Sequence, residues 1–264
     1  MDSARLVKLC CRLLAVLSLT PLAACSLWSP QPAAQIPTIE IPAREPSREN
    51  LLVIVLPGRG DDVENLRDSG IATLIQSALP HARVTLVGAQ LQYYRDGQQV
   101  PRLQSQLIEP ALAAGVQEIW MVGTSLGGFG SMLYDYEHPG VLAGIVLLAP
   151  FTGDPANLVT LAASGGPQHW PASDEGPPRT FDVAGRAIWR LVRQWSEAPT
   201  RSARVWLGCG SDDKFIDAAR QIASVLPAGH YVEVPGGHDH KTWSLAAREL
   251  FIRIRAQRLA AASR

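Results

Sequence analysis

A serine with glycines two positions before and after it is the part of this sequence best suited to covalent chemistry. The motif Gly123-Thr124-Ser125-Leu126-Gly127 joins an apolar run rich in β-formers to a helical pattern. This context is typical of a nucleophile elbow, in which a strained serine needs small neighbours. We therefore predict that Ser125 is a nucleophile and that the Leu126 N–H stabilises an oxyanion. The alternative is an ordinary turn whose serine caps the helix.

Such a serine needs a general base, and the segment Pro235-Gly236-Gly237-His238-Asp239-His240 could supply it. We expect His238 to be the base because the preceding glycines leave the loop free to place its ring. His240 is the competing candidate. The remaining histidines are expected to be structural or on the surface (His81, His138, His169, His230). The two neighbouring histidines could bind a metal, but no further cluster completes a ligand set, so no metal site is predicted.

The histidine in turn needs a carboxylate to hold its far ring nitrogen. Asp212 and Asp213 follow a predicted strand side by side, and neighbours cannot both point at one ring. The spacing leaves the choice between them open, with Asp154 as a third candidate. A second oxyanion donor is expected in Leu56-Pro57-Gly58-Arg59-Gly60, where we select the Arg59 N–H. This turn could also simply begin a helix, with Asp61 and Asp62 at the helix N-terminus.

The elements that must position these residues alternate along the chain. Apolar runs predict strands at 51–56, 84–87, 117–122, 145–149, 205–209 and 231–234. Helical spacing predicts helices at 63–79, 102–114, 126–137, 215–226 and 242–259, and residues 89–101 are expected to form a polar loop. This order indicates an α/β fold with a mostly parallel, doubly wound sheet and helices on both faces.

Residues 151–200 interrupt the alternation with glycine- and proline-rich segments followed by a helical stretch. Following the strand after the elbow, this insertion would lie above the carboxyl edge of the sheet. Trp170, Trp189 and Trp195 favour a small cap there, because exposed tryptophans would lower solubility. The alternative is a long surface excursion with no role in binding.

The N-terminal segment is typical of a targeting signal. Arg5, Lys8 and Arg12 precede a short apolar run from Leu13 to Leu22. The run Leu22-Ala23-Ala24-Cys25 resembles a bacterial lipoprotein lipobox, which implies removal of residues 1–24 and a lipid on Cys25. Ser26 after the cysteine implies, by the same resemblance, the outer membrane facing the periplasm. An ordinary signal peptide or an uncleaved anchor are the alternatives, and the apolar run is short for a membrane span of about 20 residues.

Composition supports one globular domain over residues 50–264, with 47% apolar and 18% charged residues in the 264-residue chain. The proline-rich residues 25–49 are expected to be an extended tether, and Ile36, Ile39 and Ile41 could instead form an edge strand. The full chain has no net charge and no basic stripe, so we expect no nucleic-acid partner. Cys209 would be the one free thiol of the mature domain, buried in its core. The sequence does not indicate an oligomeric state.

From about residue 50 to 260 the chain resembles an α/β-hydrolase of the serine esterase type, nearest to the esterase D-like carboxylesterases. The resemblance is carried by the segments 56–62, 123–128, 209–213 and 235–243. The Gly-Gly-His-Asp run supports His238 as base, and the family's acid, three residues after a glycine, corresponds to Asp213. Pro57 departs from the pattern, because many relatives have histidine there. The family implies no metal and no organic cofactor.

These motifs together predict hydrolysis of a small-molecule carboxylic ester or thioester through an acyl-serine intermediate. Acyl transfer to an alcohol and peptide hydrolysis would use the same residues. A different class of function, a non-catalytic, lipid-anchored binding module of the cell envelope, would retain the fold without activity.

Overall fold

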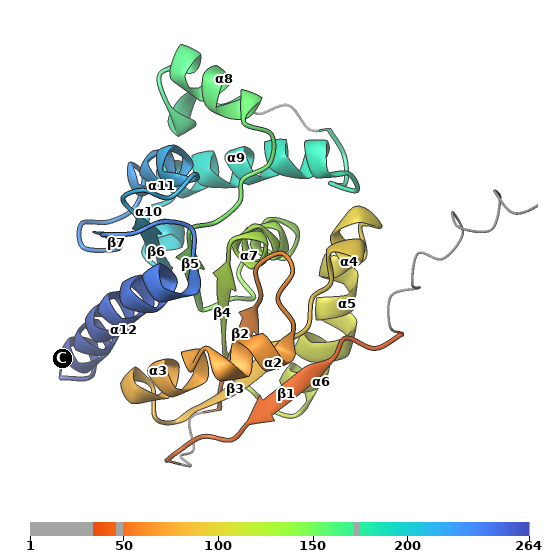
Figure 1. Ribbon diagram of the computed structural model, residues 1–264, viewed down its shortest axis with the longest axis vertical. Helices are drawn as coiled ribbons and strands as arrows, with labels where there is room; N and C mark the ends of the chain where they lie inside the picture. The colour runs from red at the N-terminus through yellow and green to blue at the C-terminus, as the bar shows by residue number, and fades with distance from the viewer. Residues whose placement is uncertain (1–33, 46–49, 172–174, 264) are drawn as a thin grey trace, which may run out of the picture. The chain divides into compact units, whose positions relative to one another are not determined.

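A seven-stranded sheet organises the part of the chain that the structure describes (Figure 1). This computed structural model describes residues 34–45, 50–171 and 175–263. By its contacts, the chain from Ala34 onward forms one compact unit. The predicted signal segment and Cys25 lie outside the described residues.

The strand order in the sheet is β1-β3-β2-β4-β5-β6-β7. The strands are β1 Thr38–Ile41, β2 Leu51–Leu56, β3 Ala82–Val87, β4 Glu118–Thr124, β5 Gly144–Leu148, β6 Val205–Gly210 and β7 Tyr231–Val234. Strands β2 to β7 pair in parallel, and β1 is antiparallel to β3. Every residue of β2, β5 and β6 is buried, as expected of strands covered on both faces. The mostly parallel sheet predicted from the sequence is confirmed.

Helices cover both faces of this sheet. They are α2 Val63–Asp68, α3 Ile71–Ala78, α4 Leu91–Arg95, α5 Gln99–Leu103, α6 Glu109–Ala113, α7 Leu126–Glu137, α8 Ala156–Ser164, α9 Phe181–Glu197, α10 Pro199–Ser202, α11 Ile216–Ala223 and α12 His240–Ala262, with short helical turns at Gln104–Ile108 and Pro167–His169. Helices α3 and α12 pack together on one face, whereas α5, α7 and α9 pack together on the other (Figure 1). None of the helices in the described ranges combines the length and apolar character needed to cross a membrane.

Two local elements differ from the sequence prediction. The helix expected at 63–79 is two helices, α2 and α3, because Gly70 adopts a left-handed conformation with φ of 73° between them. The polar loop expected at 89–101 contains α4 and the start of α5. Tyr93 and Tyr94 in this segment are buried, so packing against the core stabilises helices too short to be recognised from their sequence.

The ordered sheet also begins earlier than the boundary expected at residue 50. Strand β1 lies within the stretch interpreted as a tether, and Ile39 and Ile41 pack against the core while Ile36 is buried. The alternative interpretation as an edge strand therefore describes residues 38–41 correctly. Pairing with β3 supplies the hydrogen-bond partners that an extended tether would find only in water.

The insertion at 151–200 contributes to the interior as well as to the surface. Helix α9 packs along α7; its Trp189 and Trp195 side chains are fully buried, and Trp170 is nearly so. None of these three tryptophans lines the cavity beside Ser125. Their burial is explained by core packing, so whether the insertion acts as a cap depends on its other residues.

Candidate active site

The turn between β4 and α7 holds Ser125 in a strained backbone conformation, with φ of 51° and ψ of −111°. Such a conformation costs about 1–3 kcal/mol and persists only where neighbouring bonds enforce it. Here the Ser125 N–H donates to the Leu148 carbonyl at 2.9 Å, and the Ser125 carbonyl accepts from the Phe151 N–H at 3.0 Å. A side chain on Gly123 or Gly127 would overlap neighbouring backbone atoms, so the turn requires both glycines. The turn therefore presents the Ser125 side chain at the carboxyl edge of the sheet.

The loop between β7 and α12 brings His238 to this serine. The distance from His238 Nε2 to Ser125 Oγ is 2.9 Å, across 113 positions of sequence. The rings of Phe215 and Trp243 lie edge-on to the imidazole, each with its centroid 4.9 Å away. These two rings restrict the imidazole to one orientation.

Asp213, in the loop after β6, holds the other side of the imidazole. Its Oδ2 and Oδ1 lie 2.8 and 3.0 Å from His238 Nδ1, and the Phe215 N–H donates to Oδ1 at 2.8 Å. The Asp213 side chain has no solvent exposure. Because a carboxylate can only accept at Nδ1, that nitrogen carries the proton and Nε2 is left to accept from the Ser125 hydroxyl.

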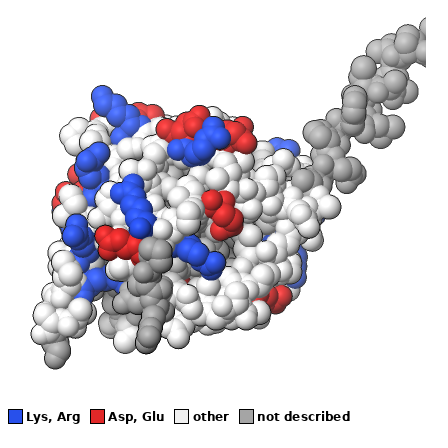
Figure 2. All heavy atoms as spheres, turned by 90° about the horizontal axis from the view of Figure 1, so that it is seen from below, with Lys and Arg blue, Asp and Glu red and all other residues white. Residues whose placement is uncertain are grey.

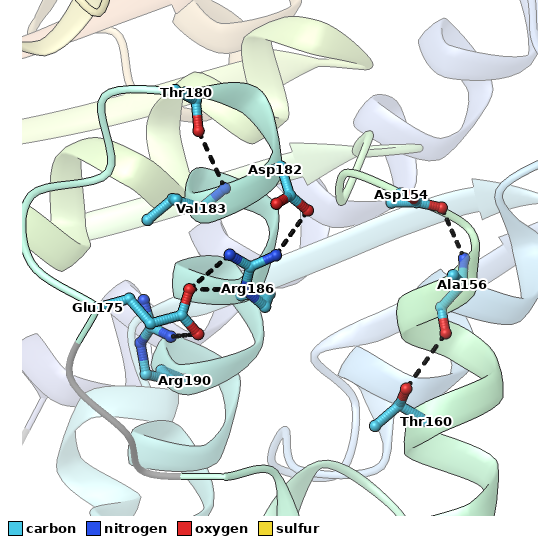
Figure 3. A network of polar contacts seen from close by, with 9 residues as sticks. All are labelled: Asp154, Ala156, Thr160, Glu175, Thr180, Asp182, Val183, Arg186 and Arg190. Carbon is cyan, nitrogen blue, oxygen red and sulfur yellow. Dashed lines mark hydrogen bonds and ion pairs between the residues drawn. The ribbon is translucent and has the colours of Figure 1, made fainter.

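The competing candidates lie apart from this chain of hydrogen bonds. Asp212 is exposed and accepts from the Ser211 hydroxyl at 3.2 Å. His240 Nε2 lies 3.1 Å from Asp61 Oδ1. Asp154 accepts from the Ala156 N–H at the start of α8 (Figure 3).

The turn between β2 and α2 lies against the serine. A methyl group on Gly58 would come within 3.8 Å of Ser125 Cβ, and Arg59 and Leu126 line the same cavity as Ser125. Among the described residues, the Arg59 and Leu126 N–H groups donate to no backbone carbonyl. Both remain available to a ligand oxygen. Asp62 caps α2 by accepting from the Asn65 N–H, whereas Asp61, expected at the same helix start, contacts His240 instead.

A cavity of about 310 Å³ opens beside Ser125. Its apolar walls include Phe151, Phe181 and Phe215, and the Phe151 ring centroid lies 6.4 Å from that of Phe181 and 5.7 Å from that of Phe215. Residues of the 151–200 insertion hold Phe181 in place: Thr180 caps α9, and Glu175 bridges to Arg186 at 2.6 Å (Figure 3). The insertion thus supplies part of the binding wall.

The sequence prediction missed the aromatic residues that hold the imidazole and line the cavity. Trp243 belongs to the histidine segment already singled out, and Phe215 follows the selected acid by two positions. Their proximity to candidate residues in the sequence was the available signal. Phe181 gave no such signal, because its position depends on how α9 packs. In the described part of the chain, no group of three or more histidine, cysteine, aspartate or glutamate residues is arranged to hold a metal.

Comparisons with known proteins give a likeness of fold. No protein-family model matches the chain, and no curated protein matches it. Among solved structures, a ferulic acid esterase superposes with a TM-score of 0.55 at 14% identity, covering 84% of this chain and 99% of its own. MPT51 (FbpC1) of Mycobacterium tuberculosis gives 0.57 at 19% identity, covering 84% and 92%. S-formylglutathione hydrolase (FrmB) of Staphylococcus aureus gives 0.51 at 16% identity, covering 81% and 82%. The fold is the α/β-hydrolase fold.

Proposed function

We propose that this chain is a serine hydrolase that cleaves a carboxylic ester or thioester through an acyl-serine intermediate. The observation that carries the proposal is the chain of hydrogen bonds from Ser125 through His238 to Asp213, at 2.9 and 2.8 Å, beside an apolar cavity. The likeness to structures named as esterases and a hydrolase supports the same class of reaction.

In the proposed mechanism each of these residues has one step. As Ser125 Oγ attacks the carbonyl carbon, its proton passes to His238 Nε2, and Asp213 stabilises the resulting imidazolium through Nδ1. The Leu126 and Arg59 N–H groups donate to the oxygen of the tetrahedral intermediate. His238 then protonates the leaving alcohol or thiol. A water molecule, deprotonated by the same nitrogen, releases the acyl group and restores the serine.

Turnover of 4-nitrophenyl butyrate by the wild type and by Ser125→Ala tests this function. We expect the substitution to lower kcat by about 10⁴ to 10⁶-fold, because the residual rate comes from binding and the oxyanion donors alone. Ser105→Ala, at an exposed serine on the helical segment before α6, is the matched control and should retain full activity. A folded wild type that cleaves no 4-nitrophenyl ester from acetyl to octanoyl contradicts the proposal.

The esterase D-like resemblance and the N-terminal motif support two finer proposals. The first is a carboxylesterase-like preference for small-molecule esters. The second is attachment to the bacterial outer membrane, facing the periplasm, through a lipid on Cys25. Metabolic labelling with an alkyne fatty acid in a bacterial host tests the attachment: the wild type should carry label and fractionate with membranes, and Cys25→Ser should do neither. Label on the Cys25→Ser variant would contradict it.

A further inference from the structure

Three cationic side chains line the cavity that contains Ser125. Arg59 lies in the loop after β2, Arg95 ends α4 after β3, and Lys214 lies in the loop after β6. Because β2, β3 and β6 are parallel, their carboxyl ends meet at one edge of the sheet, where ligands bind in such folds. The three cations therefore converge on the cavity from separate parts of the sequence.

Among the residues that the structure describes, no carboxylate lines the same cavity to balance these charges. The acidic residues nearest to the three cations in sequence have other partners. Asp61 contacts His240, Asp96 accepts from Gln92 Nε2 at 2.7 Å, and Asp213 holds His238. In the described ranges, none of the ion pairs formed by the protein includes Arg59, Arg95 or Lys214.

Several surface charges elsewhere pair with charges of the opposite sign. The underside of the molecule shows basic and acidic side chains together (Figure 2). Examples of such pairing are Arg258 with Glu118 at the start of β4, and Arg220 with Glu233. The three cations beside Ser125 differ from these pairs, because the charges that line the cavity are of one sign. Clefts lined by charges of one sign attract ligands of the opposite sign.

The cavity also has an apolar part, formed by Phe151, Phe181 and Phe215. The Lys214 ammonium lies 5.0 Å from the centroid of the Phe215 ring, so charged and apolar surfaces meet there directly. A neutral hydrocarbon ester would use the phenylalanines and leave the cations unpaired. A ligand with both an apolar part and a negative charge would use both surfaces.

We propose that the natural substrate is an anionic ester or thioester: an apolar portion packs against the three phenylalanines, and a carboxylate or phosphate group binds Arg59, Arg95 and Lys214. This inference rests on the proposed function of Ser125. Since the three side chains are exposed, their attraction for the anion is screened by salt.

Three matched pairs of esters locate the charge. Mono-4-nitrophenyl suberate against its methyl ester places a carboxylate on the acyl side. The compound 4-butanoyloxybenzoate against its methyl ester places it on the alcohol side, and 1-butyrylglycerol 3-phosphate against monobutyrin tests a phosphate. We expect the anionic member of at least one pair to have a kcat/KM about tenfold higher at low salt, mainly because its KM is lower. This advantage should be smaller in 0.5 M NaCl.

The double variant Arg95→Gln/Lys214→Gln should reduce this anionic preference about tenfold, expressed as the ratio of kcat/KM values within the pair. Arg83→Gln, at an exposed cation on β3 that does not line the cavity, should leave the ratio unchanged. Equal or better use of the neutral member in all three pairs overturns the inference. A preference that the double variant retains in full overturns it as well.

Binding to Ser125→Ala, measured by calorimetry with the same pairs, separates this inference from the proposed function. Tighter binding of an anionic ester supports the charge assignment even if the wild type proves inactive, which would contradict only the proposed function. Ser125-dependent cleavage without any preference between pair members contradicts only the anionic substrate.

Discussion

Two histidine–aspartate pairs show what distinguishes the proposed catalytic arrangement from a surface contact, and their histidines lie on either side of Asp239, where the loop after β7 meets α12. His238 contacts Asp213, His240 contacts Asp61, and both rings lie edge-on to Trp243 at 4.9 Å. The side chains of His238 and Asp213 are 17% and 0% exposed, whereas those of His240 and Asp61 are 48% and 18% exposed. The first imidazole also has a serine at its second nitrogen. Burial and a third partner, rather than the pair alone, therefore set the proposed catalytic histidine apart.

Replacing each of the two histidines by glutamine in separate variants gives the largest expected difference in catalytic activity. His238→Gln should lower kcat for 4-nitrophenyl butyrate by about 10⁴ to 10⁶-fold, because no group remains to accept the Ser125 proton. His240→Gln should change kcat/KM by about fivefold or less, because a solvent-exposed contact between a histidine and a carboxylate contributes under about 1 kcal/mol. A comparable loss in both variants would show that the pairs are not functionally distinct.

The adjacent aspartates provide the next contrast. Asp213→Asn should lower kcat about 10⁴-fold, because an amide favours the wrong tautomer of His238. Asp212 is exposed and holds only the Ser211 hydroxyl, so Asp212→Asn should reduce activity no more than about twofold. Steady-state kinetics of the two variants, with circular dichroism as the check on folding, measure the difference. Equal losses would mean that the carboxylate bound to His238 is not the orienting one.

Burial should separate ion pairs by their effect on stability as well. Asp135, near the C-terminal end of α7, has a side chain with no solvent exposure. Arg204 Nη2 donates to both of its carboxylate oxygens, at 2.6 and 2.7 Å. Arg204→Ala should lower the free energy of unfolding by about 3–5 kcal/mol because it leaves a buried carboxylate without its main partner. Asp61→Ala, at the exposed pair, should lower it by less than about 1 kcal/mol. Urea unfolding of both variants tests this ranking, and similar losses would reverse the conclusion drawn from burial.

A third histidine, His230, is buried and contacts a backbone carbonyl rather than a carboxylate. We expect it to affect only the pH dependence of the free energy of unfolding, and this is the smallest of the predicted effects. Its ring stacks on Trp206 at 3.8 Å, its Nδ1 bonds to the Val205 carbonyl, and burial lowers its pKa. Below a pH of about 6.5, this histidine therefore binds a proton more readily in the unfolded chain than in the folded chain. The free energy of unfolding consequently rises with pH through this range. The wild type should lose more stability than His230→Gln between pH 7.5 and 5.5, with a slope from this histidine below about 1.4 kcal/mol per pH unit. Parallel losses in the two proteins, measured by urea unfolding, would contradict this.

The comparison also shows which parts of the protein its sequence predicts. Continuous apolar runs such as Leu51–Leu56 predict buried parallel strands, because only a sheet covered on both faces accommodates them. The glycines around Ser125 and before His238 likewise indicate where the backbone must bend. The spacing of residues alone did not choose between Asp212 and Asp213, since the direction of each side chain depends on the turn after β6.

Features that depend on distant packing could not be predicted in this way. Helix α4 is only five residues long, and its buried Tyr93 and Tyr94 are stabilised by the core rather than by local preference. The convergence of Arg59, Arg95 and Lys214 requires three loops to be placed in space, which no local pattern contains. Their common position became visible only with the sheet topology.

The most direct test of the central claim is labelling by a fluorophosphonate followed by peptide mass mapping. The account predicts that the wild type takes up one equivalent of the probe on Ser125, because among the described residues this is the hydroxyl with an imidazole nitrogen at 2.9 Å. His238→Gln should label far more slowly, and His240→Gln at close to the rate of the wild type. A folded wild type that remains unlabelled, or that carries the probe on another residue, would contradict the assignment of Ser125 as the nucleophile.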